Sequence, residues 1–103
     1  MKTKILVEWQ DLKSFKKVDG APIVFPGFEE FEFFMYRLDG THFVNRFGDG
    51  EKGQYVITEV KTGRAVGEPS NNAEQCYNDV FNILKFNGIE AVRLGVERYS
   101  NEN

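Results

Sequence analysis

Residues 48–53, Gly-Asp-Gly-Glu-Lys-Gly, have the G-x-G-x-x-G spacing of a dinucleotide-binding loop. Such a loop binds phosphate because it follows a strand and opens a helix, whose N-terminal amides then face the anion. Here residues 54–60 follow, and their β-branched side chains predict a strand instead of a helix. Asp49 and Glu51 would also repel a phosphate, and two carboxylates are too few for a calcium loop. We interpret the segment as a hairpin loop that holds no nucleotide.

Cys76 and His42 are the only cysteine and the only histidine among the 103 residues. Held side by side, they could act as a nucleophile and its base. However, Cys76 falls on the apolar stripe of a predicted helix, where cysteine commonly serves as a small core residue. One cysteine permits no internal disulfide, and one cysteine with one histidine is too few for a zinc site. We therefore expect no catalytic residue, no metal and no cofactor, and a protein that is not an enzyme.

An acidic cluster, Glu29, Glu30 and Glu32, lies at the start of the most aromatic part of the chain. Neighbouring carboxylates can perform acid–base chemistry, but no substrate-holding side chains accompany these three. The cluster indicates either a solvated strand end or a contact surface for a basic partner. The three glutamates are our candidate protein-binding carboxylates.

Residues 31–38 predict a strand with apolar side chains on both faces, because successive side chains of a strand alternate between faces. One face would hold residues 31, 33 and 35, and the other would hold residues 34, 36 and 38. Either both faces are covered, or one remains an exposed aromatic patch that binds another protein or a second copy of the chain. In the second case, Phe34 and Tyr36 would join the glutamates as protein-binding residues.

A basic cluster in residues 13–17 provides the alternative hypothesis, since it contains Lys13, Phe15, Lys16 and Lys17. Lysines around an aromatic side chain can bind single-stranded nucleic acid. They are equally typical of a surface loop whose aromatic side chain packs inward. The formal net charge of −3, from 16 acidic and 13 basic residues, gives no general attraction to nucleic acid. Protein binding is therefore our first hypothesis and nucleic-acid binding our second.

Length and composition predict one domain that spans residues 1–103. Hydrophobic residues make up 41% of the chain and ten residues are phenylalanine, which is enough for one core without disulfides. The N-terminus is basic, but the apolar run of residues 5–7 ends at Glu8 and is too short for a secretory signal. No segment approaches the length of a membrane-spanning helix. We expect a soluble cytoplasmic protein.

The first half of the chain predicts strands. Residues 4–9 alternate apolar and polar side chains, as a strand does. Residues 11–28 contain Gly20, Pro22 and Pro26, and we expect this segment to be irregular, with a turn at 18–21 and a short edge strand at 23–25. Asp39-Gly40 predicts a hairpin turn from the strand at 31–38 into a returning strand at 41–47.

The second half predicts a short hairpin followed by helices. Thr62-Gly63 joins the strand at 54–60 to a strand at 64–67. Apolar residues at helical spacing predict a helix over about 71–87, with Ser70 or Asn71 as its N-cap, Glu74 in the capping-box position and Gly88 after its end. Residues 89–99 fit either a strand or a helix. We slightly favour a helix, because acidic residues near its start and basic residues near its end suit the helix dipole.

The order of strand, Thr-Gly turn, short strand, Ser/Asn cap and helix in residues 55–84 resembles the end of a double-stranded-RNA-binding domain. In that family the start of the helix carries lysines for the RNA backbone, whereas this chain has Glu74 there. The same layout is similar to that of many small accessory proteins of phages and mobile elements. The first resemblance implies a nucleic-acid-binding module, and the second an accessory or inhibitor protein that acts by binding another protein.

Together these patterns predict an α+β domain. An antiparallel meander sheet of four or five strands would pack on one long helix at about 71–87, followed by a C-terminal second helix or strand. Its function would be to bind another protein without catalysis.

Overall fold

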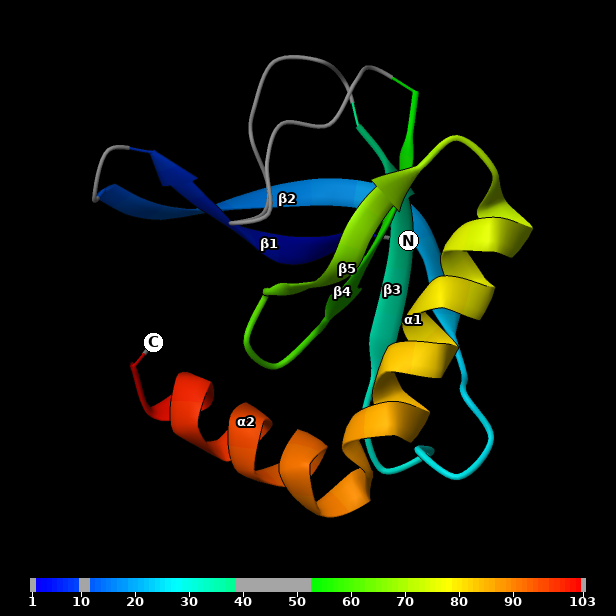
Figure 1. Ribbon diagram of the computed structural model, residues 1–103. Helices are drawn as coiled ribbons and strands as arrows, with labels where there is room; N and C mark the ends of the chain where they lie inside the picture. Colours follow the sequence, from blue (N-terminus) through cyan, green and yellow to red (C-terminus); the bar gives the residue numbers. More distant parts are fainter. Residues whose placement is uncertain (1, 10–11, 39–52, 103) are drawn as a thin grey trace.

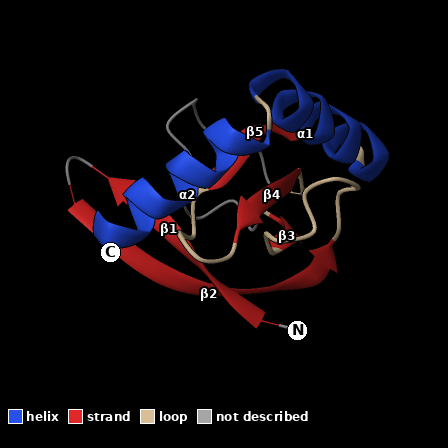
Figure 2. Cartoon of the chain, turned by 90° about the horizontal axis from the view of Figure 1, so that it is seen from below, coloured by secondary structure: helices blue, strands red, loops and turns tan. Residues whose placement is uncertain are grey.

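The computed structural model describes the backbone of residues 2–9, 12–38 and 53–102, and the side chains of residues 17–38 and 53–100. These residues form one antiparallel sheet whose strands lie in chain order, and two helices pack on the same side of it (Figures 1 and 2). The elements are β1 (Lys2–Trp9), β2 (Leu12–Ile23), β3 (Phe33–Arg37), β4 (Tyr55–Glu59), β5 (Ala65–Ser70), α1 (Ala73–Asn87) and α2 (Ile89–Glu102). The predicted α+β class and meander sheet are confirmed, and the C-terminal element is a helix nearly as long as the first.

β2 differs most from expectation, because it runs unbroken through the residues where we predicted a turn. Its first eight residues pair with β1, and its last four, residues 20–23, pair with β3. Gly20 is where the strand changes partner. A Cβ atom on Gly20 would lie 2.0 Å from the carbonyl oxygen of Met35, so glycine here permits close approach of two strands instead of forming a turn. The predicted edge strand at 23–25 is also wrong, since β2 ends at Ile23 and the chain then leaves the sheet.

The larger core lies between the sheet and the two helices. Its most deeply buried members are Phe25 and Ile57, each with no exposed surface, and Cys76 and Val80 of α1, each 1% exposed. Ile89 and Val92 of α2 pack at its margin. The apolar stripe of α1 therefore faces the sheet, as its 3.6-residue period predicted.

A second core covers the opposite face of β3. Its buried side chains are Phe34, Tyr36, Leu38 and Val56, and Val18 of β2 packs against them. β3 therefore has buried side chains on both faces, which confirms the predicted alternation and the first of our two interpretations. Phe34 and Tyr36 are each 3% exposed, so the idea that they form an exposed protein-binding patch was wrong.

The ends of α1 are fixed by an asparagine and a glycine. Asn72 is the N-cap, and its side chain accepts a hydrogen bond of 3.0 Å from the backbone N–H of Gln75. The N-cap is thus neither of the predicted residues, Ser70 and Asn71, but the one after them, and Glu74 is not in the capping-box position. Gly88, at φ +84°, ends α1 and donates its N–H to the carbonyl of Leu84, as the sequence predicted.

Two further expectations concern the predicted hairpin after β3 and membrane-spanning helices. The predicted turn at 39–40 and returning strand at 41–47 lie outside the described residues. Within the part of the chain that the structure describes, neither helix combines the length and the apolar character needed to cross a bilayer.

Candidate functional site: an acidic hollow

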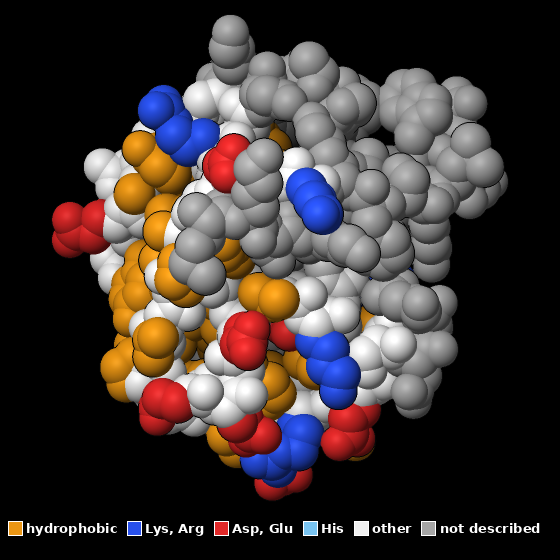
Figure 3. All heavy atoms as spheres, turned by 180° about the vertical axis from the view of Figure 1, so that it is seen from behind, with side chains coloured by type: hydrophobic (Ala, Val, Ile, Leu, Met, Phe, Trp, Pro, Cys, Tyr) orange, Lys and Arg blue, Asp and Glu red, His pale blue; other side chains and the backbone are white. Residues whose placement is uncertain are grey.

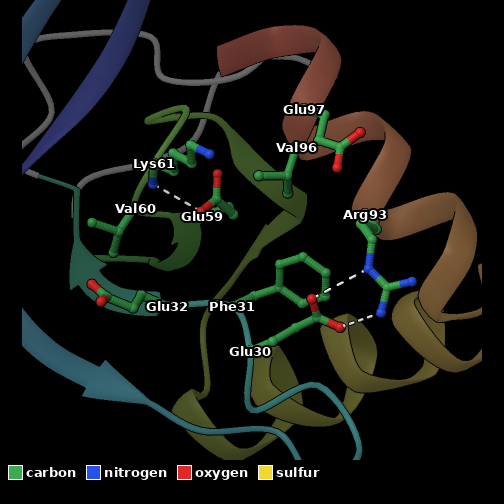
Figure 4. Close-up of a pocket in the computed structure, with 9 residues that line it drawn as sticks. All are labelled: Glu30, Phe31, Glu32, Glu59, Val60, Lys61, Arg93, Val96 and Glu97. Carbon is green, nitrogen blue, oxygen red and sulfur yellow. Dashed lines mark hydrogen bonds and ion pairs between the residues drawn. The ribbon is translucent and has the colours of Figure 1, made fainter. Parts of the chain in front are cut away.

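Three segments that are distant in sequence enclose an open hollow of about 390 Å³ (Figure 4). They are the residues just before β3, the turn between β4 and β5, and the middle of α2. We call this site the acidic hollow. Its lining consists of Glu30, Phe31, Glu32, Glu59, Val60, Lys61, Arg93, Val96 and Glu97. Four glutamates face one lysine and one arginine, which leaves two negative charges in excess.

The loop before β3 places glutamates outward by burying aromatic side chains at a spacing of three. The N–H of Phe28 bonds the carbonyl of Phe25, and the N–H of Phe31 bonds the carbonyl of Phe28, so two turns follow one another. Phe25 and Phe28 are buried, and Phe31 packs at the margin of the core. Glu30 and Glu32, on either side of Phe31, are left at the surface and line the hollow.

Glu59 has a structural role at the back of the hollow. Glu59 is 5% exposed. Its two carboxylate oxygens each accept a 2.8 Å hydrogen bond, one from the N–H of Lys61 and one from the N–H of Thr62. A buried carboxylate needs such partners. Because it holds the turn between β4 and β5, it fixes the position of Lys61 at the rim.

Arg93 of α2 closes one end of the hollow. Its guanidinium donates to both carboxylate oxygens of Glu30, at 2.6 Å from Nη2 and 3.3 Å from Nε (Figure 4). Its Nη1 lies 3.1 Å from a carboxylate oxygen of Glu90. The hydrogen bond from Arg93 is the main reason why the pKa of Glu30 is lowered, and the same contact raises the pKa of Arg93. This two-point contact ties α2 to the loop before β3.

A second contact fixes the far part of α2. The guanidinium carbon of Arg64, in the turn before β5, lies 4.1 Å from the centre of the Tyr99 ring. Such a cation–π contact is attractive and also packs the flat side chains together. α2 thus contacts the rest of the domain on both sides of Val96.

The inner surface of the hollow is apolar and part of its rim is unpaired. Phe31, Val60 and Val96 are half-buried and supply the apolar surface. Glu32 and Glu97 are exposed, and among the described residues neither carboxylate has a hydrogen-bond or ion-pair partner. Figure 3 shows that acidic and basic side chains gather along the lower edge of the face opposite to that of Figure 1.

The three glutamates of the predicted acidic cluster therefore do not all lie in the hollow. Glu30 and Glu32 share the hollow, but Glu29 instead accepts a hydrogen bond from the N–H of Gly27 within its own turn. Sequence reasoning did not identify Arg93 or Glu97 as site residues. The available signal was their i, i+4 spacing, which places both side chains on one face of a helix.

The other candidate residues lie elsewhere. The segment 13–17, predicted as a basic loop, lies within β2, with Lys13 opposite Glu8 and Lys17 opposite Lys4 in the pairing with β1. Lys17 is exposed, and the side chains of Lys13, Phe15 and Lys16 are outside the described set. Exposed apolar side chains include Val24, Leu94 and Phe86, which are 65%, 66% and 91% exposed.

Cys76 is a core residue, as predicted. It is 1% exposed and its Sγ lies 3.6 Å from the carbonyl oxygen of Tyr55. Burial, with a smaller contribution from the carboxylate of Asp79, raises the pKa of the thiol from 9.0 to about 11. Because the thiolate is the nucleophilic form, this environment does not activate the cysteine. His42 lies outside the described residues.

Residues 48–52 of the glycine-rich segment also lie outside the described residues, but Gly53 has φ +90° and the strand β4 follows it, as predicted. Within residues 2–9, 12–38 and 53–102, no group of three or more histidine, cysteine or acidic side chains is placed to hold a metal ion. The acidic hollow has to be interpreted from its own geometry, because no protein-family model, curated protein or solved structure matches this chain.

Proposed function

We propose that this domain is a non-enzymatic protein-interaction module, and that its acidic hollow receives a lysine or arginine side chain of a partner protein. The observation that carries the proposal is the pair of carboxylates of Glu32 and Glu97, which have no partner among the described residues and lie beside an apolar inner surface.

A long basic side chain fits both properties of the hollow. Its methylene stem can pack on Phe31 and Val96, while its charged head reaches the carboxylates at the rim. An arginine head could in addition stack on the Phe31 ring. The excess of two negative charges attracts a cation and repels an acidic partner, so the hollow selects by charge as well as by shape.

The contacts already made around the hollow reduce the cost of binding. Glu30 is already neutralised by Arg93, and Glu59 is engaged by backbone N–H groups. A ligand therefore does not have to order α2 or the turn between β4 and β5.

The test uses a defined cation and nuclear magnetic resonance. Nα-acetyl-arginine methylamide and its lysine analogue are titrated into the isotope-labelled protein, with the uncharged citrulline compound as the ligand control. We expect shifts centred on residues 30–32, 59–61 and 93–97, weakened by salt. The double substitution Glu32→Gln and Glu97→Gln should remove them.

The matched control is Glu74→Gln, which removes one exposed carboxylate from the first turn of α1, outside the hollow. It should bind the cation as the unmodified protein does. Two results would contradict the proposal: chemical-shift changes with the citrulline compound equal to those with the cations, or an equal loss of cation binding in the control and the double variant.

A second candidate function is nucleic-acid binding by the hairpin of β1 and β2. The register that sets Lys4 opposite Lys17 adds a lysine to the basic cluster predicted at Lys13, Lys16 and Lys17. Like charges directly opposite each other repel, and a bound polyanion would relieve that repulsion. Binding to a labelled single-stranded oligonucleotide should fall steeply between low and moderate salt. Binding that is absent at low salt would exclude this candidate.

A further inference from the structure

Among the described residues the sheet has two edges, β1 and β5, and of these two strands only β5 contains a proline, a glycine or an irregular register, which protect an edge from pairing. β5 contains Pro69, which has no N–H to donate, and Gly67 at φ +76°. Its pairing with β4 is irregular between Tyr55 and Ile57. α1 also lies close against it, since a Cβ atom on Gly67 would be 3.1 Å from Ile83. These are recognised means of preventing a further strand from adding to a sheet.

β1 lacks those features. It is eight residues long, contains neither proline nor glycine, and pairs with β2 in one unbroken register. Among the described residues, no strand pairs with its other edge. The hairpin of β1 and β2 also extends beyond the remaining strands (Figure 1), and a two-stranded hairpin alone is only marginally stable. Its centre, Ile5-Leu6-Val7, is apolar.

We propose that β1 pairs antiparallel with β1 of a second copy of this chain, with Leu6 on the two-fold axis. The charge pattern of the strand selects this occupant and this register. With Leu6 at the centre, Lys4 of each copy is opposite Glu8 of the other, and Ile5 is opposite Val7. Opposite charges and apolar pairs across strands are both stabilising.

Neighbouring registers are worse. In a symmetric antiparallel pair, directly opposite side chains share a face of the sheet. The two-fold axis must therefore pass beside one residue of β1, and an alternative register moves it to another residue. A centre at Ile5 would place Lys4 opposite Leu6, and a centre at Val7 would place Leu6 opposite Glu8. A centre at Lys4 would place two lysines opposite each other, which is repulsive. The resulting dimer would be symmetric, with the same surface used by both copies.

Charge exchange tests this register. Lys4→Glu would place two carboxylates opposite each other at both ends of the pairing, and Glu8→Lys would place two ammonium groups opposite each other there. Each single variant should raise the dimer dissociation constant roughly tenfold or more, as measured by analytical ultracentrifugation over a concentration series. A mixture of the two variants should associate again, because each chain then meets the opposite charge at both positions.

The variant Lys4→Glu also separates loss of pairing from loss of folding. Within one chain Lys4 is opposite Lys17, so the substitution replaces a repulsive pair by an attractive one and should not weaken the fold. The expected result is a folded Lys4→Glu protein with weakened association that the Glu8→Lys protein restores. A protein that sediments as a monomer at every concentration, or a dimer unaffected by either exchange, would overturn the proposal.

Discussion

Phe25 is the residue on which the loop before β3 depends most. Its side chain has no exposed surface, and its ring centre lies 4.6 Å from that of Tyr77, 5.1 Å from that of Phe33 and 5.6 Å from that of Phe81. It is not part of a strand, so no ladder of hydrogen bonds holds this stretch of backbone in place. Packing of the ring, together with the hydrogen bond that the Tyr77 hydroxyl donates to the carbonyl of Val24, supplies that attachment instead.

We predict that Phe25→Ala lowers the free energy of unfolding by about 3–5 kcal/mol, the range for a fully buried phenylalanine. The free energy of unfolding of a domain of this size is roughly 5–15 kcal/mol, so the loss is a large fraction of its stability. With a urea slope of about 2 kcal/mol/M, the unfolding midpoint falls by roughly 2 M, which circular dichroism can follow.

Phe86→Ala is the matched control, because it removes the same atoms from a side chain that is 91% exposed. Its effect should stay within about 0.5 kcal/mol, and the higher helix propensity of alanine favours a small gain. Phe25→Leu, which keeps most of the apolar volume, should fall between the two. If Phe25→Ala and Phe86→Ala had equal midpoints, the argument that ring packing fixes this loop would be refuted.

Three further predictions concern a cap, a glycine and a thiol. Asn72→Ala should cost about 1 kcal/mol of stability, while Asn71→Ala should cost less than about 0.5 kcal/mol. Urea unfolding of both variants distinguishes the observed N-cap from Asn71, one of the two predicted candidates. Gly67→Ala should lower the free energy of unfolding by about 1–3 kcal/mol in the same assay, because φ at Gly67 is +76° and the added Cβ would crowd Ile83. Gly95→Ala should not lower it, because a Cβ there would meet nothing within 4 Å. The raised pKa of Cys76 means that the folded state keeps a proton that the unfolded state releases, so its contribution to stability is complete below about pH 9 and is lost as the pH rises to about 11. Unfolding followed across that range should show a steeper decline for the unmodified protein than for Cys76→Ala, and equal slopes would contradict the assignment.

α1 was predicted from the helical spacing of its apolar residues, and β3 and β4 from runs of aromatic and β-branched residues, and all three lie close to their expected positions. β5 was expected at 64–67, but it continues through Pro69 to Ser70. β2 was missed because Gly20 and Pro22 are typical of turns, and nothing local shows that Gly20 is needed for close approach to Met35. That requirement comes from another strand, so only the folded arrangement reveals it.

The acidic hollow was predictable only in its local part. Glu30 and Glu32 stand out as neighbouring carboxylates, but Arg93 is 63 residues away from Glu30. The position of Arg93 depends on the turn at Gly88 and on the packing of Ile89 and Val92, which bring α2 back across the sheet. A local sequence pattern does not show that Glu30 and Arg93 meet, because the angle at which two helices cross is set by the side chains packed between them.

The core and the hollow have a common physical origin in the loop before β3. Phe25 and Phe28 are buried and Phe31 packs at the core margin, while Glu30 and Glu32, on either side of Phe31, are exposed. Glu30 then meets Arg93, and this contact holds α2 at the position where Glu97 completes the rim. A change in the core should therefore alter cation binding without touching a carboxylate. Phe25→Leu, if it remains folded, should bind the arginine compound more weakly than Phe86→Ala does, and equal affinities would show that the hollow is shaped independently of this core.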